Sequence, residues 1–281
     1  MSAAARPVDV PLADGRRLEA TVRGDGPATV VFEAGLGSGQ TVWALVAPVV
    51  AERARVVTYN RSGFGRSTPD AAPRTLARLA ADLLAVLDHV GAERAVLAGH
   101  SWGGPIVREA LAAAPERVAA LVLVDQTDEG CDLFFAPATV RQQRLFAAAL
   151  PALARVGLLR SMARSLARPL PAGLRRTVGE ESGTLAAARA QRAELAACDP
   201  ELRRLRDAPA PPPEVPVTVI SGTRRPRRAS AARRRDCLVA AHERRAAAAP
   251  RGRHVRAERS EHMVMLTEPS LVADEVLRLL G

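Results

Sequence analysis

The sequence predicts an α/β fold, with a mostly parallel central sheet flanked by helices and a helical segment inserted into it. Over residues 1–126, and again from residue 214, short apolar runs alternate with segments that carry apolar residues at helical spacing. Such alternation indicates parallel strands joined by helices. The intervening residues, 127–213, show no convincing strand pattern.

The first part of the chain contains a hairpin followed by alternating strands and helices. The pair Asp14-Gly15 favours a tight turn, so the flanking runs at 8–12 and 18–22 are expected to pair. A continuous apolar run at 118–124 fits a strand that is buried on both faces. The remaining expected elements are strands at 28–33, 55–59 and 94–98, with helices at 42–49 and 76–90.

The second part begins with the insertion. Residues 127–213 are rich in Ala, Leu and Arg with interrupting prolines, which predicts short helices, and they end in a proline-rich stretch that reads as a stiff linker. We therefore expect one core built from residues 1–126 and 214–281, with a helical cap at 127–213. The closing elements are expected as strands at 215–220 and 255–257 and helices at 231–249 and 270–280.

Length and cysteine usage narrow the protein class. A chain of 281 residues can form one large domain with an insertion. Its longest apolar runs fall short of the ~20 residues that span a bilayer, and its first ten residues lack a secretory signal pattern. The three cysteines show neither metal nor disulfide spacing. These features predict a cytoplasmic location, with no metal site and no membrane partner.

The net charge of +10 comes with an unusual basic composition, because all 40 basic residues are arginine. Together with the abundant Ala and Pro, this points to high-GC coding bias rather than to selection for a polyanion. Aromatic residues make up only 3% of the chain, and we find no nucleic-acid reading module, so no nucleic-acid partner is expected. A homodimer is left open.

The pentapeptide Gly99-His100-Ser101-Trp102-Gly103 carries the strongest chemical signal. It follows an apolar strand and precedes a helical run, as the G-x-S-x-G nucleophile elbow does. A turn this tight brings backbone against backbone, which favours residues without a Cβ atom. The turn would hold the Ser101 hydroxyl at the edge of the sheet, near the positive end of a helix.

Together with three further segments in the expected order, the elbow resembles the α/β-hydrolase superfamily. These segments are the glycine turn at Gly35, the stretch Tyr59–Ser67 and a histidine before the last helix. The resemblance covers 28–126 and 215–281 and implies a serine hydrolase with a helical cap, working through an acyl-enzyme without a cofactor. It also implies the chain order nucleophile, acid, base.

His262 matches the family position of the base, in the loop between the last strand and the last helix. A serine hydroxyl needs such a base within hydrogen-bond reach. The other four histidines, at 89, 100, 242 and 254, are expected to be structural or solvated, with His242 on a helix surface.

The acid is less well defined, and three candidates stay open. In many relatives it follows the strand after the cap, but here arginines occupy that stretch. We favour Asp125, at the end of the strand before the cap and 24 residues after Ser101, over Asp128 and Asp236. The arginine-rich segment 224–235 is expected at the same sheet edge, either attracting anionic substrates or merely solvated.

The oxyanion hole is expected from two backbone N–H groups, those of Leu36 and Trp102. The sequence has Glu33-Ala34-Gly35-Leu36 where a His-Gly pair is common. Glu33 either forms a local hydrogen bond or anchors the loop, and we favour the anchor.

The resemblance and the candidate residues thus predict that the partner is a small acyl substrate, an ester, thioester, lactone or amide, which the protein hydrolyses. The alternatives are a receptor-like binder on a hydrolase scaffold and a cofactor-free haloperoxidase or perhydrolase activity.

Overall fold

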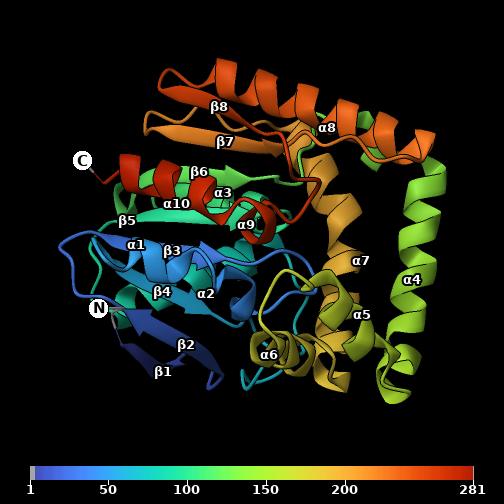
Figure 1. Ribbon diagram of the computed structural model, residues 1–281, viewed down its shortest axis with the longest axis horizontal. Helices are drawn as coiled ribbons and strands as arrows, with labels where there is room; N and C mark the ends of the chain where they lie inside the picture. Colours follow the sequence, from blue (N-terminus) through green and yellow to red (C-terminus); the bar gives the residue numbers. More distant parts are fainter. Residues whose placement is uncertain (1–3, 281) are drawn as a thin grey trace.

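The computed structural model describes residues 4–280 and contains one eight-stranded sheet with helices on both faces (Figure 1). The strands lie in the order β1-β2-β4-β3-β5-β6-β7-β8, and only the β1–β2 and β2–β4 pairs are antiparallel. The sheet confirms the predicted α/β fold. The strands are β1 Ala5–Pro11, β2 Arg17–Arg23, β3 Thr29–Glu33, β4 Arg55–Tyr59, β5 Ala95–His100, β6 Val118–Val124, β7 Val217–Gly222 and β8 Gly252–Ala257.

Two apolar clusters, one on each face of the sheet, hold the helices in place. The first joins the sheet to α2 and α3, and the second joins it to α1, α9 and α10. Helix α8 packs against β7 and β8. The bounds of these helices are α1 Ala47–Val50, α2 Leu76–His89, α3 Gly103–Ala113, α8 Ala229–Ala248, α9 Val264–Thr267 and α10 Pro269–Arg278.

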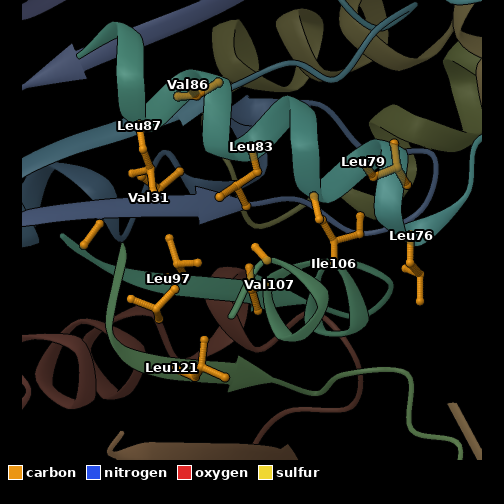
Figure 2. Close-up of a cluster of buried hydrophobic side chains, with 14 of the residues drawn as sticks. Val31, Leu76, Leu79, Leu83, Val86, Leu87, Leu97, Ile106, Val107 and Leu121 are labelled. Atoms are coloured by element: carbon orange, nitrogen blue, oxygen red, sulfur yellow. The ribbon is translucent and has the colours of Figure 1, made fainter. Parts of the chain in front are cut away.

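The first cluster follows from the side-chain periods of strand and helix. In β3, Val31 points to this face while Val30 and Phe32 point to the other. Helix α2 presents its leucines at three- and four-residue spacing, and Figure 2 shows Leu79 and Leu83 packed toward the sheet. Each fully buried leucine contributes about 2 kcal/mol to stability through the apolar surface that it removes from water. This packing fixes α3, and therefore the turn that precedes it.

The segment predicted as a helix at 42–49 instead forms a 3-10 turn, Gln40–Trp43, followed by the single-turn helix α1. Pro48 lies in the first turn of α1. Proline has no N–H to continue a preceding helix, so the chain restarts the helix at this point. Trp43 is nevertheless buried, with its ring 4.7 Å from that of Phe32.

Four helices lie between β6 and β7, beyond the right-hand end of the sheet in Figure 1. Short helices are predicted here, but two of the four are long, with 19 residues in α4 and 23 in α7. Pro151 and Pro200 lie inside these helices without ending them. The two long helices pack against each other, and this contact compensates for the backbone hydrogen bond that each proline removes. The bounds are α4 Pro137–Arg155, α5 Leu158–Leu166, α6 Ala172–Ser182 and α7 Leu185–Asp207.

No single helix within residues 4–280 is long and apolar enough to cross a membrane. Helices α4 and α5 pass that test only as a pair bent by 106°, on length and composition alone. After α7, residues 208–216 form neither helix nor strand and lead directly into β7.

Candidate active site

Ser101 occupies a strained turn between β5 and α3. Its φ is 52°, in the left-handed region that L side chains rarely adopt. The turn has no space for side chains on either flank: a Cβ on Gly99 would lie 2.4 Å from the Gly103 carbonyl oxygen, and one on Gly103 would lie 2.7 Å from that of Glu33. The backbone N–H of Ser101 donates to the Val124 carbonyl at 3.1 Å, which ties the turn to the end of β6.

The structure brings His262 and Asp125 together. His262 lies in the loop between β8 and α9, and its Nδ1 is 2.7 Å from Oδ2 of Asp125. Oδ1 of Asp125 accepts hydrogen bonds from the Gly222 N–H at 2.9 Å and from Arg235 Nη1 at 2.5 Å. Burial alone would raise the pKa of Asp125, but the hydrogen bond from His262 and the charges of His262 and Arg235 lower it to about 2. Asp125 therefore stays ionised beside His262.

The loop that carries His262 is joined to the elbow through His100. The His100 ring is 4.6 Å from the His262 ring between centroids, and its Nε2 lies 3.0 Å from the His262 carbonyl oxygen. Burial lowers the pKa of His100 to about 3, so the ring is neutral and can donate its Nε2–H to that carbonyl. Within residues 4–280, neither the Ser101 hydroxyl nor His262 Nε2 makes a hydrogen bond, an arrangement common in unliganded sites.

The other two candidate acids lie away from His262. Asp128 is paired with Arg245 at 2.5 Å, and Asp236 is exposed and paired with Arg225 at 2.7 Å. The arginine-rich segment divides between two environments, because Arg235 reaches Asp125 while Arg225 stays on the surface. The sequence gives no signal for the Arg235 contact, which joins residues 110 positions apart.

The loop after β3 passes directly beside the elbow. A Cβ on Gly35 would lie 3.1 Å from that of Ser101. Leu36, the next residue, therefore lies where the loop after β3 comes close to the elbow. In the described part of the chain, the N–H groups of Leu36 and Trp102 make no hydrogen bond to turns, loops or side chains. Both N–H groups are thus available to an oxygen atom bound at Ser101.

A buried charge network holds this loop. Arg61 donates to the carbonyl oxygens of Ala34 at 2.7 Å and Gly35 at 2.9 Å, and to Oε1 of Glu33 at 2.6 Å. Glu33 also accepts a hydrogen bond from the Tyr59 hydroxyl. This arrangement has the features of the loop anchor expected for Glu33. Burial raises the pKa of Glu33, although the charge of Arg61 opposes the rise.

The same network extends into the inserted helices. Glu194 lies on α7 and pairs with two arginines. Its Oε2 is 2.9 Å from Arg61 Nη2, and its Oε1 is 2.9 Å from Arg74 Nη2. Burial would raise the pKa of Glu194, but Arg61 and Arg74 outweigh it and lower that pKa. Glu194 is a residue that sequence reasoning misses, since its partner Arg61 lies 133 positions away and no local pattern links them.

The position of His242 differs from the sequence expectation, because its side chain is buried rather than on a helix surface. Its Nδ1 is 2.7 Å from the Ser221 hydroxyl, and its Nε2 is 2.8 Å from the Gln126 carbonyl oxygen. Helix α8 packs against β7, so a residue on the inward face of α8 is buried.

Residues 4–280 contain no group of three or more His, Cys, Asp or Glu side chains arranged to hold a metal ion.

Comparisons with known proteins agree with this architecture. Over 96 residues the chain is 41% identical to a protein named "Putative carbamate hydrolase RutD" from Azorhizobium caulinodans, covering 34% of this chain and 36% of that one. The chain thus spans about a third of the length of this relative.

Solved structures match over nearly the whole chain. A protein described as "a putative alpha/beta hydrolase from Nostoc sp PCC 7120" has a TM-score of 0.81 at 17% identity, covering 99% of this chain and 98% of that one. Est816, described as an N-acyl homoserine lactone degrading enzyme, has a TM-score of 0.69 at 21% identity, covering 96% and 99%. At these identities the likeness shows the fold alone. A family model described as alpha/beta hydrolase fold matches residues 28–173, which is more than half of the chain, and the chain therefore belongs to the α/β-hydrolase family.

Proposed function

We propose that the chain is a serine hydrolase that cleaves a small ester through an acyl-enzyme, with Ser101 as nucleophile, His262 as base and Asp125 as the orienting acid. The observation that carries the proposal is the 2.7 Å contact between His262 Nδ1 and Asp125 Oδ2, in a loop attached to the elbow. A serine hydroxyl is a weak nucleophile unless a base takes its proton, and the base must be held in the right tautomer. The low pKa of Asp125 supports that role.

In the proposed reaction, His262 Nε2 takes the proton of the Ser101 hydroxyl as its oxygen attacks the substrate carbonyl. Asp125 accepts a hydrogen bond from Nδ1–H and stabilises the positive charge on the imidazole. The N–H groups of Leu36 and Trp102 donate to the developing oxyanion. His262 then protonates the leaving alkoxide, and water attacks the acyl-enzyme with His262 again as base. The acid product leaves, and Ser101 regains its proton.

The inserted helices support a small substrate. Gln191 of α7 covers the loop at Gly37, where a Cβ would lie 2.4 Å from its Nε2. Glu181 of α6 covers the loop at Gly39, where a Cβ would lie 2.6 Å from its Oε2. Helices that close over this loop after β3 leave limited room for an acyl chain. An ester is the first choice because amide cleavage demands stronger protonation of the leaving group.

Labelling with a fluorophosphonate probe tests the nucleophile. We expect wild type and the control Ser161→Ala, at an exposed serine of α5, to gain one phosphonyl group by intact mass. Ser101→Ala should gain none, with an unchanged circular dichroism spectrum. Failure of the folded wild type to label would overturn the proposal in favour of a binding protein on a hydrolase scaffold.

Substrate choice requires turnover measurements. The panel consists of p-nitrophenyl esters of increasing acyl length together with a thioester, an amide, a lactone and a carbamate. The last two are included because of the names of Est816 and RutD. We expect kcat/KM to be highest for short acyl esters and to fall as the chain lengthens. A rise with chain length would contradict the small-substrate proposal while leaving the nucleophile intact.

A further inference from the structure

Arg235 of helix α8 is a largely buried cation that lies against the candidate acid. Its Nη1 is 2.5 Å from Oδ1 of Asp125, and the two side chains expose 10% and 0% of their surface. Within residues 4–280 the Arg235 side chain makes no other ion pair or hydrogen bond, and its Nε is buried without a partner. Burying a cation costs free energy that must be offset by its contacts. The Asp125 contact is therefore the feature that explains the position of Arg235.

A buried arginine that holds the fold together uses more of its donors. Arg61 is the example in this chain, because its guanidinium donates to two backbone carbonyl oxygens and to the carboxylates of Glu33 and Glu194. Arg235 has the same guanidinium donors and directs one of them to Asp125. This difference indicates that Arg235 serves Asp125 rather than the packing of α8.

The contact brings a full positive charge to a carboxylate that already has hydrogen-bond partners. Oδ1 of Asp125 also accepts from the Gly222 N–H at 2.9 Å, and Oδ2 lies 2.7 Å from His262 Nδ1. The Gly222 N–H helps to orient the carboxylate, whereas the Arg235 guanidinium also offsets part of its negative charge. Less of that charge is then left to stabilise the imidazolium form of His262.

We propose that Arg235 is a positioning residue of the candidate site, which holds Asp125 facing His262 and keeps the imidazole unprotonated to lower pH. The inference rests on the proposed hydrolase function, since it assigns Arg235 a role in that reaction. The unprotonated Nε2 is the form that can take the proton of the Ser101 hydroxyl. Because Arg235 acts through Asp125, its loss should change kcat and the pH profile and leave KM unchanged.

The other titratable groups near this pair do not supply the same effect. Burial lowers the pKa of His100 to about 3 and also lowers the pKa of His242, so both rings favour the neutral form. The carboxylates on the adjoining loops have arginine partners: Asp128 with Arg245, and Glu261 with Arg224. An arginine stays protonated over the whole pH range of an enzyme assay, so Arg235 acts at every pH.

The pH dependence of ester turnover tests the role of this charge. We expect Arg235→Met, which keeps an unbranched side chain without the charge, to lower the maximal kcat about tenfold with KM unchanged. The pH at which kcat/KM is half-maximal on the acidic side should rise by about one unit. Arg235→Lys keeps the charge, so its half-maximal pH should match wild type. The matched control is Arg234→Met, which removes an exposed arginine from the same helix and should change neither quantity.

Arg235→Gln provides a second neutral variant if the methionine variant does not fold, and circular dichroism and urea unfolding check every protein. The inference is overturned if a folded neutral variant keeps the wild-type pH profile, or if Arg235→Lys or Arg234→Met shifts it equally. Failure of both neutral variants to fold would make Arg235 a residue of the fold alone and would also overturn it.

These outcomes leave the proposed hydrolase function intact, provided that wild type hydrolyses the ester and the fluorophosphonate probe labels Ser101. A folded wild type that does neither contradicts the proposed function itself, and the role of Arg235 with it.

Discussion

The two carboxylate oxygens of Asp125 have different hydrogen-bond partners. Oδ2 faces His262, while Oδ1 accepts from Gly222 and Arg235. An asparagine would keep the size but present an NH2 group to one of these donors, which disfavours the tautomer of His262 that the reaction requires. We therefore expect Asp125→Asn to lower kcat on an ester by about 10³- to 10⁴-fold, as in a serine-protease triad.

The matched control for that measurement is Asp236→Asn. It makes the same chemical change in an exposed pair with Arg225, so steady-state kinetics should give a kcat/KM within about twofold of wild type. Near-normal turnover by Asp125→Asn would exclude this residue as the acid. A wild-type rate in both variants would return the choice to Asp128.

At the scale of elements, α7 is linked to the loop after β3 by the buried pairs of Glu194 with Arg61 and Arg74. Removing one member of a buried pair leaves an uncompensated charge. We expect Glu194→Gln to lower the free energy of unfolding in urea by about 3 kcal/mol or more. Asp199→Asn, on the same helix in a half-exposed pair with Arg203, should change it by less than about 1 kcal/mol. Equal effects would show that α7 is not held by these pairs.

Helix α6 is linked to the core by Glu181, which accepts hydrogen bonds from the Thr41 N–H and hydroxyl. Burial raises the pKa of Glu181 from 4.5 to about 7, although these hydrogen bonds oppose the rise. A carboxyl whose pKa is higher in the folded state binds more protons there than in the unfolded chain. The contribution of Glu181 to the free energy of unfolding is complete below about pH 4.5 and is lost as the pH rises through about 7.

The raised pKa of Glu181 predicts that the protein becomes less stable as the pH rises. Between pH 5 and pH 8 the free energy of unfolding of wild type should fall relative to that of Glu181→Gln, which carries no charge at either pH. The difference should be on the order of 3 kcal/mol. Urea unfolding of both proteins at the two pH values measures it. A parallel pH response would mean that Glu181 is solvated in the native state.

At the scale of the whole molecule, the inserted helices and the core share one packed interior. Leu202 and Leu205 of α7 belong to the same apolar cluster as α2 and α3. Both tryptophans, Trp43 and Trp102, are buried in the core and none lies in α4–α7. We expect tryptophan fluorescence and circular dichroism at 222 nm to give coincident urea transitions, because a single cooperative unit unfolds all at once. An earlier transition by circular dichroism would show that the inserted helices unfold first.

Local patterns predict the alternating elements and the elbow because these depend on neighbours in sequence. The strand at 118–124 and the Asp14-Gly15 hairpin appear as expected. Contacts that depend on distant packing are not predicted: Arg235 on Asp125, Glu194 on Arg61, and the burial of His242. The long helices α4 and α7 also escape prediction, since only tertiary packing lets a helix continue through proline.

The order of the strands also determines when the candidate site can exist. Ser101 follows β5 and Asp125 follows β6, both before the inserted helices, whereas His262 follows β8, the last strand of the sheet. During synthesis, therefore, the proposed nucleophile and acid emerge from the ribosome long before the proposed base does. If Ser101, Asp125 and His262 act as proposed, a nascent chain that stalls in α7 holds the serine without its base, and hydrolysis can begin only after β8 has added to the sheet.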